Sequence, residues 1–307
     1  MTSTAPVQDT DRVIGFTLPD SHARGRMVRL GSALEQILSA HNYPAPVEAI
    51  LTEAVTLAAL LGSTLKNGEG QLTIQAQTQR GVVKLLVCDY KNGELRGYVQ
   101  YDAKRLSQLG KKPSMKSLFN EGYLAVTFDQ VTSGERYQGI VPLDGDSLAE
   151  AAQSYFFQSE QIPSLVRLQH RRTADGTLVA GGLFLQHLPE GEVGRERLHV
   201  RLDHPEWNAV EALASTMGID ELGDASIPLE NLVWRLFNEE REVRVLGGTE
   251  LVRGCRCSAD YYRGVLTKFP ADERAEMADE NGTISVDCAF CSKVFPLALD
   301  EFVSPTL

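Results

Sequence analysis

The chain has 307 residues, 43% of them hydrophobic, which is enough for one large packed core and a smaller unit beside it. Its formal net charge of −11 argues against a general nucleic-acid or anionic-membrane partner, because such partners need clustered lysine and arginine. The N-terminus has neither the basic start nor the apolar run of a signal peptide, and no stretch approaches the roughly eighteen apolar residues of a membrane span. The expected location is therefore the cytoplasm.

The acidic excess is confined to one part of the chain. Residues 1–189 carry 18 acidic and 18 basic side chains, whereas residues 190–307 carry 23 acidic and 12 basic ones. The chain therefore divides near Pro189 into a neutral part and an acidic part.

Helices and strands are predicted to alternate through the neutral part. Helical spacing of apolar residues predicts a helix over 30–38 and a buried helix over 46–65. Strand patterns follow at 72–77, 82–90 and 91–99, with Asn92-Gly93 as a hairpin turn and Cys88 as a buried strand residue. The histidines have no metal-ligand spacing, and there is no phosphate-binding glycine loop or hydrolase motif. The protein is therefore not expected to be an enzyme.

The pattern continues to Pro189. Strands are predicted at 123–128 and 136–141, and a helix starts near Asp146 or Ser147 and ends before Pro163. Two further strands, 165–169 and 178–186, flank a turn, and Gly181-Gly182 indicates a bulge or a close strand approach. Residues 1–189 are thus predicted to form an α+β core domain.

Residues 190–250 are predicted to be an acidic, amphipathic helical linker. They carry 14 acidic and 6 basic side chains. Two apolar stripes have helical spacing: one comprises Trp207, Val210, Leu213 and Met217, and the other Leu229, Leu232, Val233, Leu236 and Phe237. Such a segment should dock on a surface and remain soluble when released, although a permanently docked connector has the same pattern.

Four of the five cysteines lie in two short motifs near the C-terminus. Cys255 and Cys257 form C-x-C, and Cys288 and Cys291 form C-x-x-C thirty residues later. Two such pairs are a standard way to assemble four thiolates around one Zn²⁺ ion, which prefers tetrahedral sulfur ligation. The zinc can be purely structural or redox-sensing, and a rubredoxin-like iron site is a further alternative.

The residues around these motifs predict a small zinc-binding domain at 251–307. Because a regular strand would hold the C-x-C sulfurs too far apart, residues 254–258 should bend, with Gly254 supplying the freedom. A short helix within 267–282 and a strand over 283–287 should lead into Cys288. So short a unit rarely gains more than roughly 3 to 5 kcal/mol from its core, whereas a structural zinc contributes on the order of 10 to 16 kcal/mol.

The same thiolates are the species that oxidants attack. Arg253, Arg256 and Lys293 lie near enough in sequence to help stabilise them. A zinc ribbon that binds nucleic acid would need a basic unit, but residues 251–307 carry 9 acidic and 6 basic side chains. A thiol-disulfide oxidoreductase would place a single C-x-x-C at the start of a helix, whereas this one follows a predicted strand and has a second pair.

The motifs resemble those of the bacterial 33 kDa heat-shock chaperonin family. The C-terminal cysteine pattern matches, and five further stretches match in the family's order from about residue 12 onward. They are H-N-Y-P-A-P-V, S-G-E-R-Y-Q-G-I-V, Y-F-F-Q-S-E-Q-I-P, A-G-G-L-F-L-Q and L-V-W-R-L-F-N-E-E. No role is assigned to the first dozen residues.

The resemblance implies a redox-regulated holdase that works without ATP. It implies one zinc ion per chain, bound by Cys255, Cys257, Cys288 and Cys291 in the reduced, inactive state. Oxidation would form the disulfides Cys255–Cys257 and Cys288–Cys291, release zinc and unfold the C-terminal domain and linker. The opened protein would bind unfolding client proteins, and the family's oxidised form is commonly a homodimer.

Overall fold

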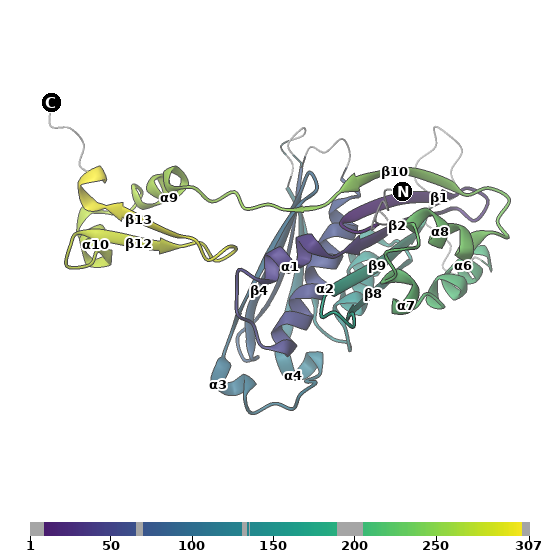
Figure 1. Ribbon diagram of the computed structural model, residues 1–307, viewed down its shortest axis with the longest axis horizontal. Helices are drawn as coiled ribbons and strands as arrows, with labels where there is room; N and C mark the ends of the chain where they lie inside the picture. The colour runs from purple at the N-terminus through teal and green to yellow at the C-terminus, as the bar shows by residue number, and fades with distance from the viewer. Residues whose placement is uncertain (1–8, 66–69, 131–133, 135, 189–204, 303–307) are drawn as a thin grey trace, which may run out of the picture.

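The computed structural model describes residues 9–65, 70–130, 134, 136–188 and 205–302 (Figure 1). A five-stranded antiparallel sheet has the order β10 (Arg244–Glu250), β1 (Arg12–Leu18), β2 (Ala23–Leu30), β9 (Leu178–His187) and β8 (Ser164–Arg172). A six-stranded sheet has the order β11 (Val252–Arg253), β5 (Glu94–Tyr101), β4 (Val83–Lys91), β3 (Gln71–Thr78), β6 (Gly122–Asp129) and β7 (Arg136–Pro142). Its neighbours are antiparallel except β11 and β5, which are parallel.

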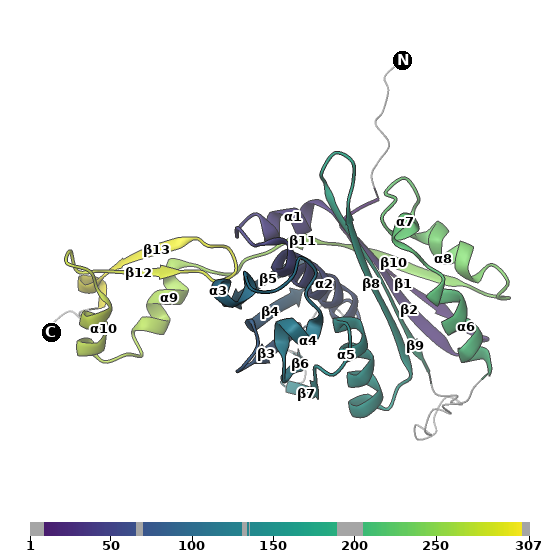
Figure 2. The same cartoon turned by 90° about the horizontal axis from the view of Figure 1, so that it is seen from below.

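Helix α2 (Ala45–Gly62) forms the centre of the core. It contacts strands of both sheets and is buried along most of its length (Figure 2). The other helices of this part are α1 (Ser32–Leu38), α3 (Ala103–Leu106), α4 (Met115–Phe119), α5 (Leu148–Tyr155) and the π-helix η2 (Phe156–Glu160). The predicted α+β class is confirmed.

The expectation that no stretch is long and apolar enough to span a membrane is not met, because α2 passes this test by length and composition. However, 72% of the 18-residue helix is buried inside the protein.

Strand β9 has both faces covered, which explains its glycine pair. A Cβ on Gly181 would lie 2.7 Å from Cβ of Leu222, and one on Gly182 would lie 2.8 Å from Cδ1 of Leu60. Leu222 belongs to helix α7 (Ile219–Leu222) and Leu60 to α2, so the glycines allow a helix to approach each face of the sheet. The predicted close approach is thus one between a strand and helices, and the pairing of β9 with β2 and β8 is regular.

The linker helices pack on the outer face of the five-stranded sheet. They are α6 (Pro205–Ser215), α7 (Ile219–Leu222) and α8 (Leu229–Phe237). Their buried residues join those of β1, β2 and β9 in one apolar cluster, with Phe16 of β1 against Phe237 of α8. The predicted α8 stripe is confirmed, but on α6 Leu213 is 39% exposed and Ala214 takes the buried position. The beginning of the predicted linker, 190–204, lies outside the described residues.

Two strands near the end of the linker were not predicted from the sequence. Strand β10 pairs with β1 at the edge of one sheet, and all seven of its residues are exposed. Strand β11 pairs with β5 at the edge of the other. Neither shows an alternating apolar pattern, because they are held by backbone hydrogen bonds at sheet edges. Strands β1 and β2 also lacked a clear sequence signal.

The C-terminal unit contains α9 (Ala259–Leu266), α10 (Ala271–Met277), the hairpin β12 (Thr283–Asp287) and β13 (Val294–Ala298), and the 3₁₀ helix η3 (Leu299–Phe302). The predicted α10 and β12 are present. Helix α9 was missed, although Ser258 caps it by accepting a hydrogen bond from the Tyr261 amide. Figures 1 and 2 show this unit extending from the core, and Figure 2 shows the chain running out to it from β11.

A buried arginine of β2 ties the linker to the core. The Arg29 side chain is fully buried, and it donates to the carbonyl oxygens of Leu222 at 2.6 Å and Ile227 at 2.9 Å. It also meets Asp9, whose carboxylate accepts the first amide of α8, that of Leu229, at 2.7 Å. Residues before position 12, to which the sequence assigned no role, therefore help to dock the linker.

Arg29→Met should loosen the linker. Removing one partner from a buried charged network leaves carbonyl and carboxylate groups unpaired, which costs about 3 to 5 kcal/mol of unfolding free energy. We expect a lower thermal midpoint and faster amide hydrogen exchange in α7 and α8, with α2 still protected. Arg244→Met, the same change on exposed β10, serves as the control. Equal stability of the two variants would contradict this role of Arg29.

Candidate metal centre

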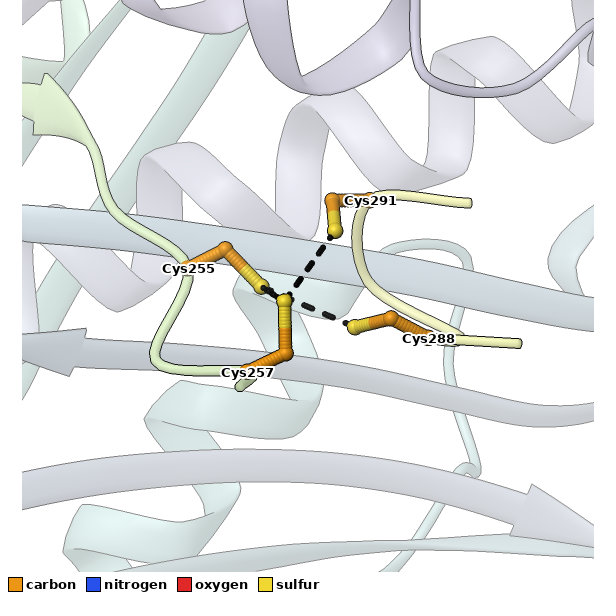
Figure 3. A group of neighbouring side chains, drawn as sticks. All are labelled: Cys255, Cys257, Cys288 and Cys291. Atoms are coloured by element: carbon orange, nitrogen blue, oxygen red, sulfur yellow. Dashed lines mark hydrogen bonds between the residues drawn. The ribbon is translucent and has the colours of Figure 1, made fainter. Parts of the chain in front are cut away.

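The four predicted cysteines come together from two separate segments of the C-terminal unit. Cys255 and Cys257 lie in the irregular segment after β11, and Cys288 and Cys291 flank the turn between β12 and β13 (Figure 3). That turn is closed by the Ser292 amide, which donates to the Cys288 carbonyl at 2.8 Å. The C-x-x-C pair therefore projects both sulfurs to one side.

The sulfur atoms form a compact group with the dimensions of a metal site. All four lie within 4.8 Å of one another. The Sγ–Sγ distance is 3.3 Å from Cys255 to Cys257, 3.6 Å from Cys255 to Cys288, and 3.4 Å from Cys257 to Cys291. A tetrahedral zinc with Zn–S bonds of about 2.3 Å separates its sulfurs by about 3.8 Å. The donor set and its spacing thus fit a tetrahedral thiolate site.

The C-x-C segment bends as predicted, but Gly254 has a different role from the one expected. Residues 254–258 are not in regular secondary structure, which allows the two sulfurs to converge. Gly254 does not have a positive φ, so its backbone conformation does not require a glycine. A Cβ there would lie 2.5 Å from Cβ of Glu94, and the Gly254 amide donates to the Leu95 carbonyl at 2.9 Å. The glycine allows close contact with β5.

The protonation of the thiols is uneven across the cluster. Burial raises the pKa of Cys288, but hydrogen bonds from the Tyr262 hydroxyl and from backbone amides outweigh it and lower the pKa to about 6. Burial and the neighbouring sulfur of Cys255 raise the pKa of Cys257. Tyr262 was not identified from the sequence; it is on the unpredicted helix α9. The fifth cysteine, Cys88, is fully buried in β4 as predicted.

Arg256, one of the three basic residues expected to help stabilise the thiolates, has other partners. The Arg256 guanidinium lies 3.4 Å from an Asp89 carboxylate oxygen and 3.6 Å from one of Glu94. Lys293 Nζ lies 5.0 Å from the centre of the Phe295 ring. Arg256 therefore pairs with carboxylates of the core rather than with sulfur.

The unit around the cysteines has little core of its own. In its described part, 251–302, one cluster contains three buried hydrophobic residues, Leu266, Ile284 and Leu297, with a few half-buried neighbours. By contrast, the clusters on either side of the five-stranded sheet are far larger. The convergence of four sulfurs thus joins the segment after β11 to the β12–β13 turn of a unit with a small core.

The chain also matches known proteins along almost its whole length. A family model described as "Hsp33 protein" matches residues 11–297. A protein named "33 kDa chaperonin" from Caulobacter vibrioides is 40% identical over 308 residues, covering 97% of this chain and 98% of the relative. Another of that name, from Ectopseudomonas mendocina, is 37% identical over 280 residues, covering 91% and 89% of the two chains.

The fold is shared with a solved structure. The crystal structure of the 33 kDa chaperonin (heat shock protein 33 homolog) from Thermotoga maritima superposes with a TM-score of 0.75 at 22% identity, covering 95% of this chain and 96% of that chain. The match of the family model to nearly all of the sequence, with full-length relatives at up to 40% identity, shows that this chain belongs to the Hsp33 family of chaperonins.

Proposed function

We propose that this chaperone is a redox-regulated, ATP-independent holdase that is inactive while reduced and zinc-bound. The observation that carries the proposal is the cluster of four sulfurs within 4.8 Å in a unit with a minimal core. Family membership supports the chaperone role. A zinc ribbon that binds nucleic acid is the alternative, and the acidic balance of residues 251–307 disfavours it.

The four thiolates of Cys255, Cys257, Cys288 and Cys291 would hold one zinc per chain. When bound, the ion supplies a four-coordinate cross-link between the two turns and contributes on the order of 10 to 16 kcal/mol to folding of the unit. Tyr262 holds Cys288 by a hydrogen bond, and the β12–β13 hairpin holds Cys288 and Cys291 on one side of their turn.

Oxidation would cancel that cross-link. Within each pair, two thiolates would lose two electrons to form one disulfide, while hydrogen peroxide takes up those electrons and two protons from solvent to give two molecules of water. We assign the disulfides to sequence neighbours, Cys255 with Cys257 and Cys288 with Cys291. Neither bond joins the segment after β11 to the β12–β13 turn, so the unit loses that cross-link and should unfold.

The path of the chain explains how this unfolding would reach the linker. Upstream of Cys255, the backbone runs through β11 and β10 to α8, and both strands lie at sheet edges. The exposed side chains of β10 contribute little burial, so its attachment rests mainly on pairing with β1. Loss of the C-terminal unit should therefore loosen first β11, then β10, then the helices.

The face beneath the linker is the surface that we assign to clients. Helices α6 to α8 cover Ile14 and Phe16 of β1, Met27 of β2, and Leu183 and Leu185 of β9. These side chains are almost completely buried while the linker is docked. Their release would present a contiguous apolar surface to unfolded chains, while the acidic linker maintains solubility.

Other features of the proposal follow the family resemblance. We place the boundaries of the core domain, linker and zinc-binding domain at 1–189, 190–250 and 251–307, although β10 shows that the end of the linker pairs with the core. We also propose a cytoplasmic location, homodimer formation on oxidation, no catalytic activity, and no nucleic-acid or membrane partner.

Replacing Cys288 and Cys291 together by serine should abolish tight zinc binding. Two of four thiolate ligands are lost, so zinc measured after dialysis should fall from about one per chain to near zero. Because α2 and the sheets lie outside the unit, the variant should retain the core fold by circular dichroism. Cys88→Ser is the control and should keep its zinc. Full zinc occupancy of the double variant would refute the four-ligand assignment.

Peroxide treatment at mild heat should release zinc and switch on client binding together. The zinc-loaded protein is oxidised while free zinc is followed with a chromogenic chelator, and aggregation of a heat-labile test protein is measured by light scattering. We expect suppression of aggregation to rise with zinc release, without ATP, and to reverse after reduction with zinc present. Complete zinc release without any suppression would rule out the holdase function.

A further inference from the structure

The two cysteine motifs touch the core through the residues between their cysteines. Phe290 of the C-x-x-C motif packs edge-on against Tyr98, with ring centroids 4.9 Å apart. The guanidinium carbon of Arg96 lies 3.9 Å from the centre of the same ring, within the range of a cation–π interaction. The Phe290 carbonyl lies 3.3 Å from Nε2 of His41. The C-x-x-C turn is therefore seated on side chains of the core.

Arg256, between the other two cysteines, meets the same place. It donates to the Gln71 side chain at 3.2 Å and to the Asp89 carboxylate at 3.4 Å. Asp89 is buried and also accepts from Nε of Arg96 at 2.7 Å. Asp89 thus lies between Arg256 and Arg96, and Arg96 lies beneath Phe290, so both motifs converge on one ion pair.

The pair belongs to a platform on adjacent strands. Asp89 of β4 is directly opposite Arg96 of β5, and Thr73 of β3 is opposite Asp89. The Thr73 hydroxyl donates to the Asp89 carboxylate at 2.8 Å. Since Arg96 and Asp89 are held by neighbouring strands, their positions are set by the core, independently of the C-terminal unit.

We propose that Phe290 and Arg256 are positioning residues that connect the metal site to the core through the Arg96–Asp89 pair. The proposal rests on the redox switch proposed above and identifies where the cysteine motifs contact the core. Each residue is adjacent to a cysteine, so the cross-linked sulfurs fix the separation of the two side chains. When each motif closes on itself, that separation is lost, and the two can no longer occupy the platform together.

The contact matters because it supports β11. The amides of Val252 and Gly254 donate to the carbonyls of Gly93 and Leu95 on β5, both at 2.9 Å. These hydrogen bonds join the last residues before Cys255 to the edge of the six-stranded sheet. When the cysteine motifs undock, these two hydrogen bonds lose their support. Hydrogen exchange at the Val252 and Gly254 amides therefore reports directly on the state of the contact.

A double-mutant cycle on the reduced, zinc-loaded full chain tests the proposal. Phe290→Ala should accelerate hydrogen exchange at the Val252 and Gly254 amides roughly tenfold, as expected for losing an aromatic and cation–π contact, and Arg96→Met should accelerate it more, because it also removes the ion-pair partner of buried Asp89. In the double variant, hydrogen exchange should be accelerated by far less than the product of the two single accelerations, because each residue acts through the other. Zinc should remain at one per chain. Phe269→Ala, a change at an exposed phenylalanine of the same unit, should leave exchange unaltered.

The outcomes separate this contact from the switch itself. Unaltered exchange in both single variants, or effects that multiply fully in the double variant, would overturn the proposal. Arg96→Met lies outside the metal unit, so it tests the contact even if Phe290→Ala loses zinc. The measurement needs no oxidant or client, and thus it stands if holdase activity is absent. If the contact and the switch both hold, Phe290→Ala should release zinc at a lower peroxide concentration than Phe269→Ala.

Discussion

The convergence of four sulfur atoms is the constraint on which the proposed switch depends. Within the described residues, the apolar cluster of the C-terminal unit has only three buried members with a few half-buried neighbours, a small core for a unit of this length. The sulfurs join a bend after β11 to a hairpin turn thirty residues later. In the proposed switch, a metal cross-link held by thiolates would be strong and chemically removable, which would place folding of the unit under the control of oxidants.

In the proposed switch, the remainder of the molecule would translate the state of this cross-link into exposure of an apolar face. The five-stranded sheet carries α2 on one side and the linker helices on the other, and glycines of β9 admit both (Figure 2). The α2 side is a large permanent core. The linker side is attached through buried Arg29, through the edge strand β10 and through β11 beside the cysteines. The α2 side of the sheet is therefore suited to a stable core, and the linker side is suited to release of the linker helices.

Much of the core and all four candidate ligands could be predicted from the sequence, because local rules govern them. Alternation identified β3, a buried apolar run identified α2, and Asn92-Gly93, both with positive φ, form the predicted hairpin turn. The edge strands β10 and β11 carry no such signal, since their side chains are largely exposed. Arg256 was interpreted as a thiolate partner because its neighbours in the chain are cysteines, whereas its partners Asp89 and Glu94 are distant in sequence.

Hydrogen exchange during oxidation would show whether the four-cysteine cluster is coupled to the linker. Zinc-loaded protein is treated with peroxide, and exchange in α6 to α8, β10 and α2 is followed by mass spectrometry alongside zinc release. The account predicts that protection of β10 and the linker helices falls as zinc leaves, while α2 remains protected. Complete zinc release and disulfide formation with the linker helices still fully protected would contradict it.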